Sequence, residues 1–186
     1  MRPFSFVRGR RARVLLSSLV VAVCGGSATD LAMAVGELNE VAEETLPQVG
    51  VPTDSPALFR WLEAREYRDF ASESAAHPSA GPHPVNVITY LNRSMEQSLA
   101  SGSARHPVGA AAVKELLGSD GTLRGWAVMV KLYQDRNGGD AWYWYEVTSR
   151  DPSRATKPDY AGVGLGLCVG CHSSGRDQVR IPFPLR

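Results

Sequence analysis

The sequence predicts an α+β fold that is mainly β, with an antiparallel sheet and a few peripheral helices. Residues 125–133 and 141–147 are rich in the β-branched and aromatic residues that favour strands. The Asn137-Gly138 pair between them is a strong hairpin signal. No regular alternation of strands with long helical segments, typical of a parallel sheet, is visible.

A helix is expected to begin at Asp54 or Ser55, because either side chain can accept hydrogen bonds from free backbone N–H groups. Its apolar residues recur at near-helical spacing: Leu58, Phe59, Leu62, Tyr67 and Phe70. Residues 77–84, rich in proline, are predicted to break this helix and to form a rigid loop. A strand over 85–91 and a short helix over 93–100 are expected next.

Residues 110–117 are predicted to be the strand that pairs ahead of the hairpin, although their alanines also suit a helix. Strand side chains alternate between faces, so one face would carry a lysine among apolar residues: Ala110, Ala112, Lys114 and Leu116. Glu115 would point to the opposite face. After the hairpin, the glycines at 162, 164 and 166 predict a loop that leads to the C-terminal segment.

The first 34 residues have the features of a secretory signal peptide. An arginine-rich start and a short apolar stretch, 14–23, precede small residues and a cleavage site after Ala34. The apolar stretch is too short to span a bilayer core, which takes about 20 residues. We therefore predict a periplasmic protein with no stable membrane span after cleavage. A permanent N-terminal anchor, or a lipidated Cys24 as in bacterial lipoproteins, is the less favoured alternative.

The chain of 186 residues is long enough for one ordinary domain besides this segment. We divide it into a signal peptide (1–34), a lead-in with one helix (35–84) and the main domain (85–186). The formal net charge of +1 belongs to the whole chain. Cleavage after Ala34 leaves 15 of its 20 basic and 18 of its 19 acidic residues, a net charge of −3. A mildly acidic protein gives no reason to expect a nucleic-acid partner.

The residues most informative about function are Cys168-Val169-Gly170-Cys171-His172. Cys-x-x-Cys-His is the attachment motif for c-type haem. The two thiols of Cys168 and Cys171 add to the two vinyl groups of one haem, and His172 becomes the proximal iron ligand. Outside the signal region the chain has only these two cysteines. The predicted cofactor is therefore one covalently bound haem c.

Three other interpretations of the motif are less favoured. A thioredoxin-like redox pair normally follows a strand within a βαβ unit, which is not seen here. A plain disulfide would leave His172 unexplained. A zinc site would need two more ligands, which His77, His83 or His106 could supply only from distant loops.

The position of the motif predicts an open site on the iron. Only 14 residues follow His172, and none is methionine, the residue that often completes the coordination of electron-carrying haems. Met129 is a candidate sixth ligand, but a strand methionine usually packs in the core. Five-coordinate or water-bound iron suits small-molecule binding or redox chemistry better than plain electron transfer.

Lys114 is the second candidate site residue. The two alanines on its predicted face leave room for a large planar cofactor. The pattern alone favours an exposed strand lysine, because lysine is seldom buried.

The run His106-Pro107-Val108-Gly109-Ala110-Ala111-Ala112-Val113-Lys114-Glu115-Leu116 resembles the cytochrome P460 family. So do the aromatic strand 142–145, the late haem motif and the trailing Asp177-Gln178-Val179-Arg180. The resemblance covers roughly residues 85–186. It implies an antiparallel β fold, a homodimer and a periplasmic haem c. It also places Lys114 at the position of the lysine that is cross-linked to the porphyrin in cytochrome P460, so that Lys114 would face the haem. Relatives of the cytochrome c′-beta type share the fold without that bond.

The resemblance implies two functions: oxidation of hydroxylamine, with electrons passed to a soluble partner, or binding of nitric oxide or a similar gas. Cytochrome P460 carries a distal carboxylate on the strand after the lysine strand, whereas residues 126–133 contain no Asp or Glu. Ala127 or Met129 would lie near that position. Glu146 could substitute only if its strand faces the haem. The missing carboxylate favours binding slightly, because a proton relay typically contributes 10²–10⁴-fold to a rate.

Overall fold

The computed structural model describes residues 49–83 and 86–186. All of them belong to one compact unit, Thr45–Arg186. The predicted signal peptide, with Cys24 and the cleavage site after Ala34, lies outside the described residues, as do most of the lead-in and residues 84–85. Within the described part of the chain, no helix is both long and apolar enough to cross a membrane.

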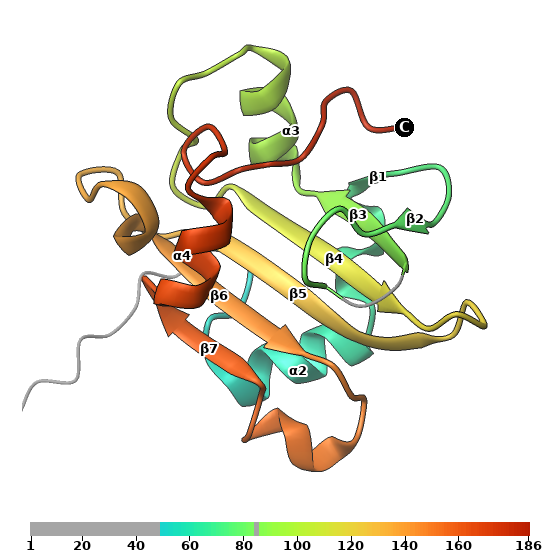
Figure 1. Cartoon of the computed structure of the whole chain (residues 1–186). Coiled ribbons are helices and arrows are strands. Elements are labelled where there is room, and N and C mark those ends of the chain that lie inside the picture. Colours follow the sequence, from blue (N-terminus) through green and yellow to red (C-terminus); the bar gives the residue numbers. More distant parts are fainter. Residues whose placement is uncertain (1–48, 84–85) are drawn as a thin grey trace, which may run out of the picture. The chain divides into compact units, whose positions relative to one another are not determined.

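The fold is α+β and its sheet is antiparallel, as predicted (Figure 1). The strands run in the order β1-β3-β4-β5-β6-β7, and β2 also pairs with β3. Their bounds are β1 Ala71–Ser72, β2 His77–Pro78, β3 Asn86–Leu91, β4 Ala111–Leu117, β5 Leu123–Lys131, β6 Trp142–Val147 and β7 Tyr160–Val163. The described residues also form three α-helices: α2 Ser55–Glu63, α3 Arg93–Ala100 and α4 Gly166–His172.

The pairing register aligns side chains across strands β3 to β7. Five residues on neighbouring strands lie directly opposite one another and form one row: Thr89, Lys114, Ala127, Glu146 and Tyr160. The row two residues along consists of Leu91, Ala112, Met129, Trp144 and Gly162. Because side chains alternate along a strand, both rows face the same side of the sheet.

Helices α2 and α4 cover opposite faces of the sheet (Figure 1). On one face, the apolar side of α2 packs into a core built around Trp126, Val113 and Val128. On the other face, Cys168 and Val169 of α4 pack against Ala112 and Met129. We call the face under α4 the front face.

Helix α2 begins where the sequence predicts and ends earlier. The Asp54 side chain accepts a hydrogen bond from the backbone N–H of Ala57 at 3.0 Å and caps the helix. Helical spacing wrongly extended the helix to Phe70, because Arg65 adopts the left-handed conformation with φ 59°. A 3₁₀ helix, η2 (Glu66–Asp69), follows and carries Tyr67 into the core.

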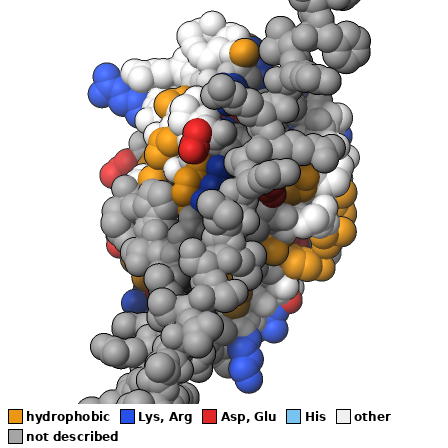
Figure 2. Space-filling model, turned by 90° about the vertical axis from the view of Figure 1, so that its left-hand side faces the viewer, with side chains coloured by type: hydrophobic (Ala, Val, Ile, Leu, Met, Phe, Trp, Pro, Cys, Tyr) orange, Lys and Arg blue, Asp and Glu red, His pale blue; other side chains and the backbone are white. Residues whose placement is uncertain are grey.

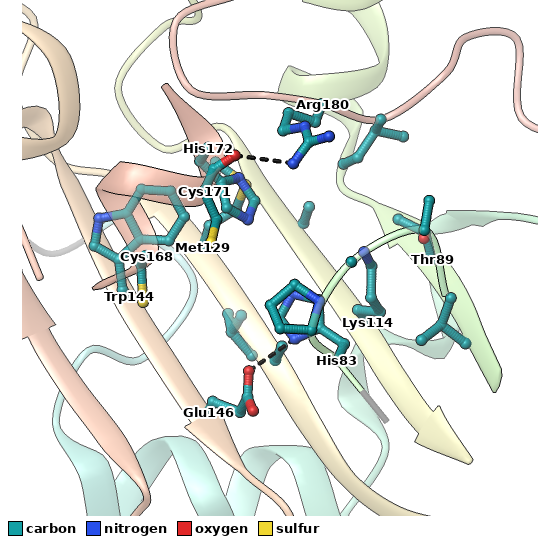
Figure 3. Close-up of a pocket in the computed structure, with 18 of the residues that line it drawn as sticks. His83, Thr89, Lys114, Met129, Trp144, Glu146, Cys168, Cys171, His172 and Arg180 are labelled. Carbon is teal, nitrogen blue, oxygen red and sulfur yellow. Dashed lines mark hydrogen bonds and ion pairs between the residues drawn. The ribbon is translucent and has the colours of Figure 1, made fainter. Parts of the chain in front are cut away.

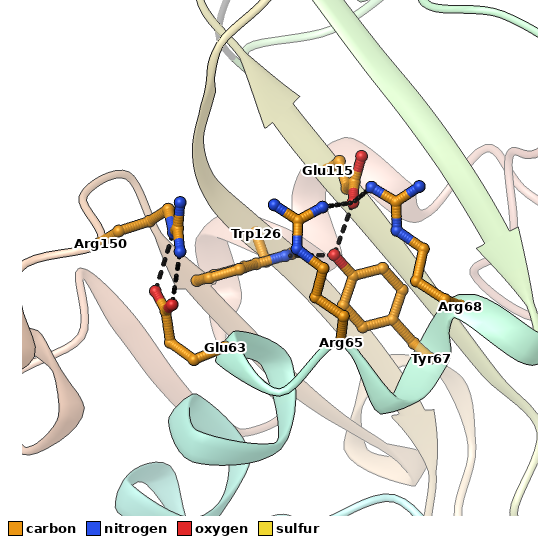
Figure 4. Close-up of polar contacts among 7 residues, drawn as sticks. All are labelled: Glu63, Arg65, Tyr67, Arg68, Glu115, Trp126 and Arg150. Atoms are coloured by element: carbon orange, nitrogen blue, oxygen red, sulfur yellow. Dashed lines mark hydrogen bonds and ion pairs between the residues drawn. The ribbon is translucent and has the colours of Figure 1, made fainter.

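A buried hydrogen-bond network fixes the opposite face of β4 (Figure 4). The Tyr67 hydroxyl donates to Glu115 Oε1 at 2.5 Å and accepts from Trp126 Nε1 at 2.9 Å. Arg68 Nη2 donates to the same carboxylate oxygen at 2.7 Å. Glu115 is only 2% exposed, so these bonds replace the water that its charge loses. The prediction that Glu115 and Lys114 point to opposite faces is confirmed.

Several connections differ from the sequence prediction. His77–Pro78 is not loop but the short strand β2, which pairs with β3. The Asn137-Gly138 pair does not form a tight hairpin, because pairing between β5 and β6 stops at Lys131 and Trp142. The ten intervening residues include a 3₁₀ helix, η3 (Gly138–Ala141). Another 3₁₀ helix, η4 (Pro152–Ala155), follows β6.

The glycine-rich segment predicted as loop contains strand β7 and the start of helix α4. By contrast, helix α3 lies where expected, and Asn92 caps it by accepting from the backbone N–H of Met95. Strand β4 is also where the sequence placed it, with its first paired residue at Ala111.

Figure 2 shows charged side chains of both signs on the visible surface of the described residues, with hydrophobic side chains between them. Four large hydrophobic residues of the described chain are exposed: Val108, Tyr160, Leu167 and Phe183. Tyr160 and Leu167 lie next to the front face, on β7 and α4. Isolated exposed hydrophobic residues are normal on a protein surface.

We expect Tyr67→Phe to lower the free energy of unfolding by about 1–3 kcal/mol, the usual cost of leaving a buried polar group unsatisfied. Burial raises the pKa of the Tyr67 hydroxyl, which therefore stays protonated and donates to Glu115. Without it, the buried indole N–H of Trp126 loses its acceptor. Urea unfolding of both proteins measures the difference. Tyr160→Phe, the same change at an exposed site, should alter stability by less than about 0.5 kcal/mol. Equal effects of the two changes would contradict the prediction.

Candidate functional site

A cavity of about 380 Å³ lies between the front face of the sheet, α4 and the C-terminal segment. Four residues singled out in the sequence line it: Lys114, Cys168, Cys171 and His172. Figure 3 shows the motif residues on one side of the cavity and Lys114 on the other. The volume is within the range of about 300–1,000 Å³ that small-molecule and cofactor sites occupy.

The sheet supplies one wall of this cavity, which is formed by the two cross-strand rows. Lys114 faces it from β4 and Glu146 from β6, with Ala127 of β5 between them. Ala112 contributes a second short side chain from the neighbouring row. These alanines leave open space where larger side chains would fill the cavity. Lys114 is therefore not an exposed strand lysine, the interpretation that the pattern alone favoured.

Helix α4 presents all three motif side chains together. Cys168, Cys171 and His172 occupy positions i, i+3 and i+4, which lie on one side of a helix. Both cysteines are free thiols. The helix packs closely on η3, because a Cβ at Gly139 would lie 1.9 Å from Val169 Cγ2. Glycine at position 139 is therefore required for this approach.

His172 has the hydrogen bonding of a metal ligand. Its Nδ1 lies 2.8 Å from the carbonyl oxygen of Gln178. A carbonyl can only accept, so Nδ1 carries the proton and Nε2 of the neutral ring keeps a lone pair. Burial lowers the pKa of His172, which favours this neutral form. The Trp144 ring packs against the imidazole, with 4.7 Å between ring centroids.

Burial also shifts the other candidate groups toward their neutral forms. It raises the pKa of the Cys168 thiol to about 11. It lowers the pKa of the Lys114 amine, against the smaller opposing effect of the carboxylates of Glu73 and Glu146. Arg180, at the edge of the cavity, donates from Nη1 to the Cys171 carbonyl oxygen at 2.9 Å.

Two carboxylates border the cavity, each beside a histidine. Glu146 Oε2 lies 2.8 Å from His83 Nδ1, within ion-pair distance, although the angles are not those of a hydrogen bond (Figure 3). Glu73 Oε2 accepts from the Thr89 N–H at 2.6 Å, and its Oε1 is 3.1 Å from His77 Nε2. No pattern in the sequence indicates Glu73 as a cavity residue, and the direction of Glu146 was open. The register opposite Lys114 and Ala127 is the signal that places Glu146.

The donor set fits a c-type haem. Two free thiols and a neutral imidazole with an available Nε2 line one cavity, and its sheet wall is kept open by alanines. Met129 borders the cavity but is buried in the apolar cluster with Trp144, so its observed contacts are those of packing. Among the residues that the structure describes, no three His, Cys, Asp or Glu side chains converge as a metal site of their own.

Comparison of the chain with protein-family models and with curated proteins finds no match. The candidate site therefore stands on its own residues and geometry.

Proposed function

We propose that this protein is a periplasmic mono-haem c protein of the cytochrome P460 type, whose iron binds a small nitrogen species such as nitric oxide. The observation that carries this proposal is the convergence of Cys168, Cys171, His172 and Lys114 on one cavity. The four residues come from two elements more than 50 positions apart in the chain. A structural role for each residue separately would not require them to share a cavity.

In this proposal each residue has a distinct role. Cys168 and Cys171 attach the haem, and His172 ligates its iron through Nε2. The alanines at 112 and 127 leave space for the porphyrin beside Lys114. The haem, when bound, supplies an iron that binds small ligands and changes oxidation state. The packing of Met129 in the apolar cluster with Trp144 supports an iron that is open to such a ligand.

The position of Glu146 in the cavity supports a second function, the oxidation of hydroxylamine. That oxidation releases protons as well as electrons, so a base within the cavity would assist it. The sequence left this role unfilled, because β5 carries no Asp or Glu between 126 and 131. Glu146 lies directly across from Ala127 on the neighbouring strand and lines the same cavity. His83, 2.8 Å from its carboxylate, could carry the proton toward the surface.

The resemblance supports three further parts of the proposal: a homodimer, a soluble electron-transfer partner and a covalent bond between Lys114 and the porphyrin.

The intact mass of the protein, produced in cells that assemble haem c, should exceed that of the cleaved polypeptide by one haem after denaturation. The double substitution Cys168→Ser and Cys171→Ser should remove this added mass, because serine forms no thioether. The matched control, Ser149→Ala together with Ser153→Ala, changes two exposed residues outside the cavity and should keep the haem. An unmodified mass for the unaltered protein would reject the central proposal.

The optical spectrum tests the Lys114 cross-link. We expect a strongly red-shifted and broadened ferrous Soret band, because a covalent bond perturbs the conjugated ring. Lys114→Arg keeps a long basic side chain without the amine and should restore an ordinary haem c spectrum. Identical ordinary spectra for both proteins would exclude the bond while leaving haem attachment intact.

Glu146→Gln should lower hydroxylamine oxidation with an artificial electron acceptor by about 10²–10⁴-fold, the usual contribution of a proton-transfer group. Binding of nitric oxide to the ferrous protein should change little, since it requires no proton transfer. Glu63→Gln is the control. Glu63 lies at the end of α2, on the face opposite to the cavity, where it pairs with Arg150. No turnover by the unaltered protein would leave ligand binding as the function.

A further inference from the structure

The turn after α4 contains two consecutive residues in the left-handed conformation, Asp177 with φ 47° and Gln178 with φ 72°. Residues other than glycine rarely adopt this conformation, and it persists only where the surroundings enforce it. Strained backbone of this kind is concentrated at functional sites. The backbone carbonyl of Gln178 is the group that accepts from His172 Nδ1.

A buried ion pair holds this turn. Lys131 Nζ, at the end of β5, lies 2.8 Å from both carboxylate oxygens of Asp177. Its side chain is 0% exposed, and Nζ is 5.0 Å from the centroid of the Trp142 ring. The backbone N–H of His106 donates to Asp177 Oδ2 at 2.9 Å. The carboxylate of Asp177 is therefore held by two residues from separate parts of the chain, His106 and Lys131.

Stability alone does not explain a fully buried lysine at this position. Removing two charges from water costs as much as their attraction returns, and well-packed apolar pairs are often at least as stable. A buried ion pair does, however, fix geometry, because each charge must keep its partner. Here the geometry that it fixes is one residue away from the hydrogen-bond acceptor of His172.

We propose that Lys131 and Asp177 are positioning residues that hold the Gln178 carbonyl on His172 and so set how strongly the imidazole binds the iron. This inference rests on the proposed haem function. A carbonyl that accepts from Nδ1 gives the imidazole partial anionic character and makes Nε2 a stronger donor. A stronger donor stabilises the ferric state and lowers the reduction potential.

The decisive variant is the double substitution Lys131→Met and Asp177→Asn. Methionine has nearly the length of lysine, and asparagine tolerates the left-handed conformation, so no buried charge is left unpaired and backbone preference is retained. In the haem-loaded protein, resonance Raman spectroscopy measures the ferrous iron–histidine stretching frequency, and spectroelectrochemistry measures the midpoint potential. We expect the frequency to fall and the potential to become more positive.

Asp177→Glu provides a second test should the double variant fail to fold. It keeps the ion pair and lengthens it by one methylene group, which moves the turn without unpairing Lys131. A smaller shift of the same sign is expected in both measurements.

Tyr67→Phe is the control for a purely structural role, because it removes buried hydrogen bonds on the opposite face of the sheet. It should lower stability without moving either signal. Unchanged frequency and potential in the folded, haem-loaded variants would overturn this inference and leave the proposed function standing. Absence of covalent haem from the unaltered protein would overturn both.

Discussion

The cross-strand register of β4, β5 and β6 is the constraint on which the candidate site depends. Side chains alternate along a strand, so a slip of one residue would exchange the faces of Lys114 and Glu115. Glu115 can be buried only where Tyr67 and Arg68 donate to its carboxylate, while Trp126 in turn donates to the Tyr67 hydroxyl. Those contacts therefore select the register in which Lys114, Ala127 and Glu146 line the cavity. A hydrogen-bond network on one face of the sheet thus determines which side chains line the cavity on the other face.

The strands of the central sheet could be predicted from composition, because β3, β5 and β6 are dense in β-branched and aromatic residues. Strand β7 and helix α4 could not, since the glycines at 162 and 166 are typical of loops, and the contact that docks α4 comes from outside both elements. Glycine at 139 admits Val169, and helix α4 is held by that contact rather than by its own propensity. Helix α2 was predicted too long because hydrophobic periodicity does not reveal the left-handed conformation of Arg65.

The residues of the candidate site also fall into two groups, those that the sequence could predict and those that it could not. Cys168, Cys171 and His172 could be recognised from spacing alone, because the motif is local. The direction of Lys114 needed a strand assignment, and that of Glu146 needed the register between β5 and β6. Glu73 and the Lys131–Asp177 pair join segments far apart in the chain. Such long-range contacts produce no periodic pattern in a single sequence, so they could not be predicted from it.

The contact between Val169 and Gly139 has a consequence for the energetics of the proposed haem binding. Apolar packing on η3 docks helix α4, so the thiols and the imidazole are already directed at the cavity. A ligand that meets ordered groups loses less of its binding free energy to conformational entropy than one that must order them. The proposed attachment segment is thus preorganised. The sheet and its connections, rather than the cofactor, would bear the entropic cost of assembling the site.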